Sequence, residues 1–271
     1  QIGSSSEDIG YDIQVGDSGS IYIVGGTGGG FDGNTNAKSG CSSNCSHDII
    51  MLKYDASGNK TWSKQIGLSD REQASGLTVD SSENLFVVGY SNTPSIGTDA
   101  SGIQSAHGMF LAKYNSSGDQ SWAVRFDPQA ESSGNSGFQH NEVALDSSGN
   151  IYVVGTSGGF EGESRLGYYD GFLVKTNSSG VKQGSKQIGT SSWDQAHEVI
   201  VDSTDSIYLT GETYGDDLFG NSGLGEGSEI FLMKFDPDGT KKWAQQLGTS
   251  SGDFGYGLTS DTSNNIYICT A

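Results

Sequence analysis

The chain has little of three things that often reveal a function: basic residues, cysteines and long apolar runs. Only 14 of its 271 residues are lysine or arginine, against 33 aspartates and glutamates, so the formal net charge is −19. A surface this acidic repels phosphate groups and anionic lipid, which argues against nucleic-acid and membrane-surface binding. No window approaches the roughly 20 apolar residues of a membrane-spanning helix, so we expect no such segment.

Cysteine is scarce, with three residues in the chain. Cys41 and Cys45 lie close together in a polar loop, where a local disulfide would fit an oxidising compartment. Free thiols, or a zinc site that includes His47, are the alternatives. No signal peptide opens the sequence, which starts within a repeat already in progress, so we expect a processed or partial chain.

Proline is nearly absent, with 3 residues, whereas glycine is abundant, with 42. High glycine content can indicate disorder, but regularly spaced Ile, Val, Tyr, Phe and Trp argue against disorder here. This composition suits many short strands joined by glycine-rich turns. Because no apolar run shows a sustained helical period, we predict an all-β fold.

The sequence repeats itself with a period of about 60 residues. A lysine that ends an apolar run recurs at spacings of 60, 62 and 59 residues, at Lys53, Lys113, Lys175 and Lys234. A tryptophan and then a Gln-(Ile/Leu)-Gly motif follow it in most copies, although Arg125-Phe126-Asp127 replaces the motif in the third. We place the repeats at 1–64, 65–124, 125–185, 186–245 and 246–271, the last one partial.

Each repeat contains four short apolar runs bounded by Gly, Asn, Asp and Ser, which predicts four strands, here named a to d. In the fourth repeat they are His197–Val201, Ile207–Thr210, Ile230–Phe235 and Trp243–Leu247. Turns that begin with Asp or Asn join a to b and c to d, so both pairs are predicted to be tight hairpins. The b–c connections are long and variable and share one face with the d–a connections, where we expect function to lie.

A repeat of about 60 residues with four antiparallel strands is typical of a β-propeller blade. The pattern Q-I-G-T-S-S-x-D, then V-x-V-D-S-x-G-N-I-Y-V-x-G, then D-x-F-x-V-K-x-(D/N)-x-S-G-x-x-x-W resembles the bacterial SBBP, or seven-bladed β-propeller, repeat over essentially the whole chain. The resemblance implies a propeller, often on secreted or surface proteins, and no settled activity. We predict four full blades and a partial fifth, as one propeller domain or part of a larger propeller.

Acidic residues open two of the predicted strands. Those that open strand a are Asp8, Glu72, Asp194 and Asp253. They would form a rim around the propeller axis that concentrates cations, with Ca²⁺ as the candidate metal. Alternatively, each carboxylate accepts backbone N–H bonds within its own d–a turn. Those that open strand c, where we expect them to cap the b–c loop, are Asp48, Asp170 and Glu229.

Aromatic residues on the variable loops are the main candidates for ligand binding. The candidate set is Tyr90, Tyr169, Trp193, His197 and Tyr214, with Tyr168 and Phe219 nearby. Aromatic rings can stack against sugars, or they can simply pack within their own loops. His140 and His197 are also candidates for metal binding or proton transfer. No Ser/His/Asp order and no His-Glu-x-x-His motif is present, so we predict no catalytic residue.

These observations predict a non-catalytic, secreted or cell-surface module that uses its long loops for binding or assembly. Its partner would be a glycan, an extracellular protein or a second copy of itself. One alternative is an enzyme that acts on a polysaccharide at the channel mouth, which requires residues of several blades to converge. Another is a structural subunit of a surface filament, completed by strand exchange between copies.

Overall fold

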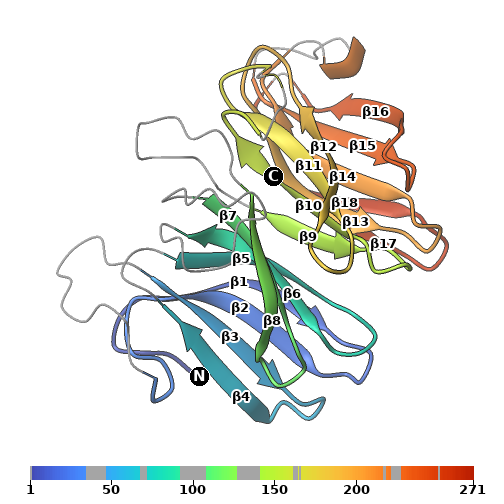
Figure 1. The fold of residues 1–271 in the computed structure, drawn as a ribbon. Helices are drawn as coiled ribbons and strands as arrows, with labels where there is room; N and C mark the ends of the chain where they lie inside the picture. The colour runs from blue at the N-terminus through green and yellow to red at the C-terminus, as the bar shows by residue number, and fades with distance from the viewer. Residues whose placement is uncertain are drawn as a thin grey trace. The chain divides into compact units, whose positions relative to one another are not determined.

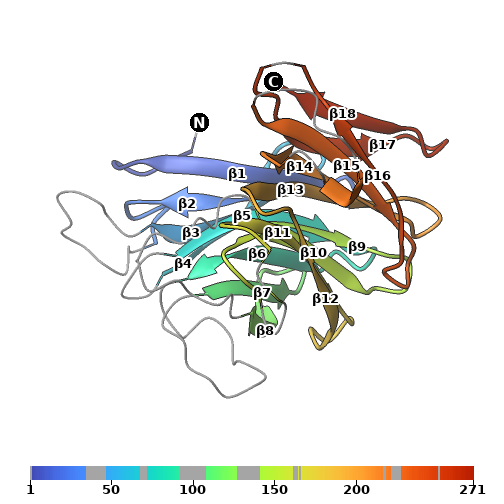
Figure 2. The same ribbon diagram turned by 90° about the horizontal axis from the view of Figure 1, so that it is seen from above.

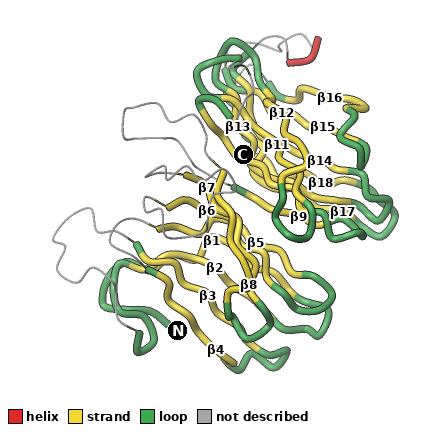
Figure 3. The backbone as a smooth tube through the Cα atoms, in the orientation of Figure 1, coloured by secondary structure: helices red, strands yellow, loops and turns green. Residues whose placement is uncertain are grey.

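The computed structural model describes residues 2–34, 47–67, 72–91, 108–126, 141–160, 164, 166–215, 218–220, 227–249 and 251–271. Within these residues the regular secondary structure is almost entirely β-strand, as Figure 3 shows, and the strands pair in antiparallel sheets. The chain divides into two compact units, Gln1–Asp127 and Pro128–Ala271. The all-β prediction is therefore confirmed, whereas the arrangement of the repeats in one domain stays a prediction.

The first unit contains two four-stranded sheets (Figure 1). The first sheet pairs its strands in chain order, β1 (Asp8–Val15), β2 (Ile21–Thr27), β3 (Asp48–Tyr54) and β4 (Lys60–Ile66). The second does the same with β5 (Glu72–Val79), β6 (Leu85–Ser91), β7 (Gly108–Tyr114) and β8 (Gln120–Phe126). β5 packs against β1, β2 and β3. The two sheets share one core, to which Tyr22, Met51 and Leu77 belong.

The second unit contains two four-stranded sheets and one pair of strands. The first sheet consists of β9 (Glu142–Leu145), β10 (Ile151–Ser157), β11 (Asp170–Thr176) and β12 (Lys182–Ile188). The second consists of β13 (Asp194–Val201), β14 (Ile207–Thr213), β15 (Glu229–Phe235) and β16 (Lys241–Leu247), with the 3₁₀ helix η1 (Leu218–Gly220) after β14. β17 (Gly255–Ser260) and β18 (Ile266–Thr270) form the pair, and β17 lies against β13 and β14 (Figure 2).

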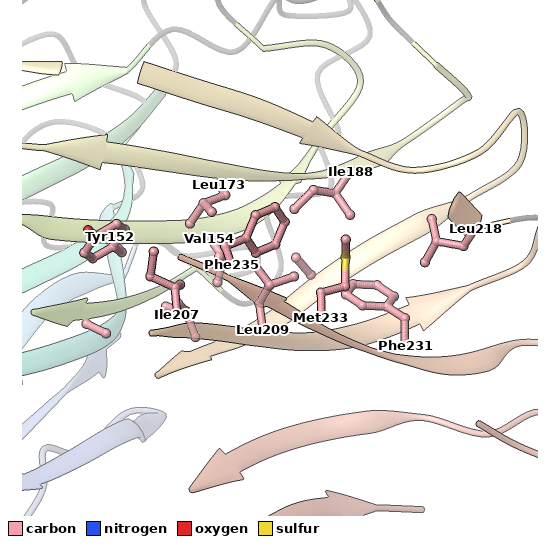
Figure 4. Packing of buried hydrophobic residues seen from close by; sticks show 13 residues of the cluster. Tyr152, Val154, Leu173, Ile188, Ile207, Leu209, Leu218, Phe231, Met233 and Phe235 are labelled. Atoms are coloured by element: carbon pink, nitrogen blue, oxygen red, sulfur yellow. The ribbon is translucent and has the colours of Figure 1, made fainter. Parts of the chain in front are cut away.

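Apolar side chains fill the space between the two four-stranded sheets of the second unit (Figure 4). From the first sheet come Tyr152, Val154, Leu173 and Ile188, and from the second Ile207, Leu209, Phe231, Met233 and Phe235. Because strand a of one blade packs on the preceding sheet, the two middle strands of each sheet are buried on both faces. This burial explains apolar runs such as Ile151–Val154 that do not alternate with polar residues.

The predicted a–b and c–d hairpins are confirmed. In the turn after β13, Asp202 Oδ1 accepts the backbone N–H groups of Thr204 at 2.8 Å and Ser206 at 3.0 Å. This is the local capping that an aspartate at the start of a turn provides. Corresponding aspartates begin the turns at Asp80, Asp146 and Asp261.

Three a–b turns carry a residue other than glycine at positive φ: Glu83, Asp205 and Asn264, with φ of 62°, 60° and 60°. Each of these side chains bonds to the preceding sheet of its unit. Glu83 Oε1 accepts the N–H of residue 18 at 3.1 Å, Asp205 Oδ1 accepts that of residue 147 at 2.8 Å, and Asn264 Oδ1 accepts the hydroxyl of residue 203 at 2.9 Å. The bonds between neighbouring blades offset the backbone cost of the left-handed conformation.

Strand b contains a glycine whose place is fixed by close contact with strand a. In β14 this is Gly211, which lies opposite an irregularity in the pairing between Ala196 and Glu198 of β13. A Cβ built on Gly211 would fall less than 3.0 Å from the backbone oxygen of Gln195. Gly25 and Gly89 have corresponding surroundings in the first unit. A bulged strand a therefore requires glycine at this position.

The repeated lysine and tryptophan also have a structural role. In the first sheet Tyr22, Lys53 and Trp62 are neighbours across β2, β3 and β4. The ammonium group of Lys53 lies 4.8 Å from the centre of the Tyr22 ring, and the Trp62 ring centre lies 6.4 Å from it. A cation–π contact and an aromatic pair thus recur across three strands of a blade.

Candidate functional site

A pocket in the second unit brings together aromatic residues from three loops. It has a volume of about 460 Å³ and is lined by Tyr168, Ser191, Ser192, Trp193 and Tyr214. Tyr168 is 65% exposed, Trp193 48% and Tyr214 47%, so their rings are open to solvent. The sequence prediction named both Trp193 and Tyr214, and the structure places them at one pocket.

Backbone hydrogen bonds hold the three loops of this pocket side by side. The N–H of Tyr168 donates to the carbonyl of Ser192 at 3.2 Å, and the N–H of Tyr214 donates to the carbonyl of Trp193 at 2.9 Å. Tyr169 and Trp193 also form a parallel bridge, and their rings meet edge to face with centres 5.1 Å apart. Tyr169 thus supports Trp193 and does not line the pocket. These backbone hydrogen bonds between the loops give the pocket a preorganised shape.

Two buried carboxylates accept hydrogen bonds from the backbone of the loops that form the pocket. Asp170, which follows Tyr169, accepts the N–H groups of Leu166 at 3.1 Å and Gly167 at 3.0 Å. Asp194 accepts the N–H of Thr190 at 2.7 Å and the hydroxyls of Thr190 and Thr213. Burial raises the pKa of both carboxyl groups, while these hydrogen bonds oppose the shift.

The glutamine of the Gln-(Ile/Leu)-Gly motif ties the acid of strand c to the outer strand of the same sheet. Gln187 Nε2 donates to Asp170 Oδ2 at 2.6 Å. The corresponding pairs are Gln65 with Asp48, at 2.8 Å, and Gln246 with Glu229, at 3.0 Å. The sequence shows the motif, but its role depends on pairing between strands that are more than ten residues apart.

The β5–β8 sheet changes both members of this pair together. Gly108 replaces the acid, and Arg125 replaces the glutamine. The Arg125 guanidinium donates to the carbonyl of Ser91 at 3.3 Å, and a Cβ on Gly108 would lie 3.1 Å from its Nη2. The larger arginine therefore occupies space that an acidic side chain takes in the other sheets. The replacement of both the acid and the glutamine in the same repeat was the sequence signal that these two positions form a pair.

Three of the acids that open strand a, Asp8, Asp194 and Asp253, bond to their own d–a turns, as one of the two interpretations expected. Asp8 Oδ2 accepts the N–H of Ser4 at 2.5 Å, and Asp253 Oδ2 accepts that of Thr249 at 2.7 Å. Glu72 is fully buried. Among the described residues, no group of three or more His, Cys, Asp or Glu side chains is placed to hold a metal ion. Calcium binding stays a prediction.

The remaining predicted residues are distributed elsewhere. Tyr90 lies on β6 of the first unit. His197 is 6% exposed, with Nδ1 3.1 Å from the carbonyl oxygen of Gly255 and its ring stacked on Tyr256. It does not line the pocket. Cys41, Cys45 and His140 lie outside the described residues, as does the side chain of Phe219.

Glu212 was not singled out in the sequence. It is 5% exposed on β14, and no hydrogen-bond partner reaches its Oε2 among the described residues. Burial raises the pKa of this carboxyl group to about 7. Its neighbours in the sheet are Gln195 and Ile230, which carry no charge. An isolated glutamate in a strand rich in apolar residues gives little sequence signal, because its burial is set by tertiary packing.

Two curated proteins show limited similarity to the chain. The regulatory protein FlaEY of Caulobacter vibrioides is 26% identical over 209 residues, which cover 71% of this chain and 21% of that protein. The uncharacterized WD repeat-containing protein L264 of Acanthamoeba polyphaga mimivirus is 29% identical over 115 residues, covering 39% of this chain and 8% of that protein. The chain thus spans about a fifth or less of the length of these relatives.

Two solved structures are similar at low identity. A gluconolactonase from Xanthomonas campestris has a TM-score of 0.45 and 13% identity, over 96% of this chain and 68% of that one. An ulvan lyase of polysaccharide lyase family 25 has a TM-score of 0.48 and 11% identity, over 95% and 62%. Neither similarity bears on the chemistry of this chain.

The family comparison agrees with the repeats seen in the sheets. The SBBP β-propeller repeat matches residues 61–94, 183–219 and 242–269. Each match begins in the outer strand of one sheet and continues through the first two strands of the next. No helix in the described part of the chain is long and apolar enough to cross a membrane. The chain therefore contains β-propeller repeats of the SBBP type in these three regions.

Proposed function

We propose that the second unit binds carbohydrate and that the aromatic pocket is its binding site. The observation that carries this proposal is the convergence of three exposed rings, those of Tyr168, Trp193 and Tyr214, on one pocket. Aromatic rings offer flat apolar faces to the C–H groups of a sugar, while tyrosine and serine hydroxyls can bond to sugar hydroxyls. The volume of about 460 Å³ is in the usual range for small-ligand sites.

The residues around this pocket favour binding over catalysis. Its lining consists of tyrosine, tryptophan and serine. The carboxylates nearest in sequence, Asp170 and Asp194, are fully buried and already accept several hydrogen bonds, so a bound sugar does not reach them. In this proposal the protein acts outside the cell, where polysaccharides are available, and the propeller serves as a rigid support.

Calorimetric titration with a panel of short oligosaccharides tests the proposal. Trp193→Ala and Tyr214→Ala should each weaken binding at least about tenfold, the value of a lost stacking contact of about 1.4 kcal/mol. Tyr256→Ala is a matched control, because Tyr256 is a 50% exposed aromatic of the same unit that does not line the pocket. Equal loss in all three variants, or no binding by the parent protein, contradicts the proposal.

The same panel tests the enzyme alternative. Products released during incubation with a bound oligosaccharide, followed by chromatography, would indicate turnover. Recovery of the intact oligosaccharide supports a binding role. Self-association and filament formation stay predictions, which sedimentation at several protein concentrations would test.

A further inference from the structure

We propose that the second unit binds a calcium ion between the loop that leads into β11 and the loop that leads into β13. Its protein ligands are the carboxylates of Asp170 and Asp194 and the main-chain oxygens of Thr190 and Ser192. The proposal does not depend on what the aromatic pocket binds. It rests on a buried oxygen that lacks a donor, on the oxygens around it, and on the charge of the two carboxylates.

The atom that points to a ligand is Oδ1 of Asp170. This residue is fully buried, and its other oxygen, Oδ2, accepts three hydrogen bonds. The donors are the N–H groups of Leu166 and Gly167 and the side-chain amide of Gln187. Oδ1 is buried as well, and no hydrogen-bond donor reaches it among the described residues. A carboxylate oxygen that leaves water without gaining a donor or a cation costs free energy, so a ligand is expected beside it.

The surroundings of Gly167 show that other oxygens gather near Asp170 Oδ1. A Cβ built on Gly167 would lie within 3.1 Å of three oxygen atoms. These are Asp170 Oδ1 and the main-chain oxygens of Thr190 and Ser192. Because a carboxylate and two carbonyls can only accept hydrogen bonds, this group of oxygens attracts a cation.

The second carboxylate approaches Oδ1 next to another glycine. A Cβ built on Gly189 would lie within 3.0 Å of both Asp170 Oδ1 and Asp194 Oδ2, so these oxygens are at most about 6 Å apart. Two ligands on opposite sides of a calcium ion are about 5 Å apart, so a shift of at most about 1 Å lets them share one ion. Gly189 ends the Gln-Ile-Gly motif, which thus supplies both the amide that holds Oδ2 and the space beside Oδ1.

The charge of the pair favours a divalent cation over a water molecule. No ion pair within the described part of the chain includes Asp170 or Asp194. Burial raises the pKa of both carboxyl groups, and the charge of Asp194 adds to the rise for Asp170. A cation between them removes this repulsion. Calcium takes roughly six to eight oxygens from carboxylates, main-chain carbonyls and water, and the exposed Leu166 and Ser191 beside the site leave room for water.

Thermal unfolding with calcium chloride is the first test. The full chain is treated with EDTA, dialysed into buffer without chelator, and unfolded with and without calcium. For a dissociation constant of about 0.1 mM, about 1 mM calcium should raise the midpoint by about 3 °C. Magnesium at the same concentration should give a much smaller shift, because it requires a near-ideal octahedron of ligands. No shift with calcium, or equal shifts with both metals from general binding to the acidic surface, overturns the proposal.

Asp170→Asn removes one ligand and supplies the missing donor. Its oxygen can still accept the N–H groups of Leu166 and Gly167, while its NH₂ group can donate to the surrounding oxygens. We expect this variant to be at least as stable as the parent protein without calcium, and to bind calcium at least about tenfold more weakly in calorimetry. Asp119→Asn, which removes a 65% exposed carboxylate of the first unit, should leave the affinity unchanged. Equal affinity in Asp170→Asn and the parent contradicts the proposal.

Terbium luminescence locates the ion, and it decides the question if Asp170→Asn does not fold. Tb³⁺ occupies calcium sites and emits when a nearby tryptophan is excited. Trp193 directly precedes Asp194, so Trp193→Phe should lose most of this emission and keep the thermal shift with calcium. Trp243→Phe, on β16 of the same unit, should keep the emission. Emission that falls equally in both variants, or in neither, places the ion elsewhere and overturns the proposal.

These measurements use metal ions alone, so they are independent of the carbohydrate titrations. A protein that binds calcium and no oligosaccharide retains the metal site and loses the proposed function. A protein that binds an oligosaccharide and shows no calcium response retains the proposed function and loses the metal site.

Discussion

Replacing Glu212 by glutamine should remove a pH-dependent loss of stability from the second unit. Glu212 lies on β14 and is 5% exposed, and its Oε2 has no hydrogen-bond partner among the described residues. Burial raises the pKa of its carboxyl group from 4.5 to about 7. The folded state therefore binds a proton that the unfolded state has already released between these two pH values.

The sign and the size follow from this difference in pKa. The favourable contribution of protonated Glu212 is fully present below about pH 4.5 and is lost as the pH rises through about 7. From pH 5 to pH 8 the loss amounts to about 2 to 3 kcal/mol of unfolding free energy. The glutamine variant is permanently neutral, so its stability relative to the parent protein should rise by this amount over the same interval.

Urea unfolding at pH 5 and pH 8 measures the effect, and the comparison of variant with parent cancels the titration of all other groups. Hydrogen exchange of amides in β13, β14 and β15 assigns it to the second unit. Asp119→Asn controls for the loss of one surface carboxylate. A difference between Glu212→Gln and the parent that is the same at both pH values would refute the reasoning, because it would mean that water or another group solvates the carboxylate.

Two further predictions concern residues that recur in each repeat. Gly211→Ala should destabilise the second unit by about 2 kcal/mol or more in thermal unfolding, because the new Cβ overlaps the backbone of β13. Gly184→Ala should have little effect in the same measurement, because no atom lies within 4 Å of the Cβ that it adds. Gln187→Leu should lower the unfolding free energy by about 1 to 3 kcal/mol, because it removes a hydrogen bond to buried Asp170. Gln183→Leu, on the exposed face of β12, should lower it by less than about 0.5 kcal/mol. Equal losses of unfolding free energy in urea would contradict the role of Gln187 as a partner of Asp170.

Local sequence signals were sufficient for the strands and the turns. The run of Ile207 to Thr210 and the aspartate at 202 correctly predicted a strand and its preceding turn. The structure extends that strand through Gly211, Glu212 and Thr213, and β13 begins at Asp194, three residues before the predicted start. These polar extensions are buried by the facing strands and loops, and the pattern of apolar residues carries no information on such contacts.

The aromatic pocket was predictable in its residue types but not in its membership. Trp193 and Tyr214 were candidates because exposed aromatics on variable loops favour binding. That they meet depends on backbone bonds between loops that are about 20 residues apart. Tyr90 had the same local signal and lies in the other unit, and His197 turns below the surface to bond to Gly255. Which aromatic residues line the pocket depends on hydrogen bonds between loops, and these tertiary contacts cannot be predicted from the local sequence.

The direction of the bonds made by the a–b turns has a consequence for synthesis on the ribosome. Glu83, Asp205 and Asn264 each bond to a sheet that is translated before them. The N–H and hydroxyl groups at the a–b turn of a newly made blade therefore lack these partners until the a–b turn of the next blade emerges from the ribosome. Folding should advance from the N-terminal side, one blade behind the growing end, and a ribosome that pauses within a blade leaves the preceding turn open to solvent or chaperones.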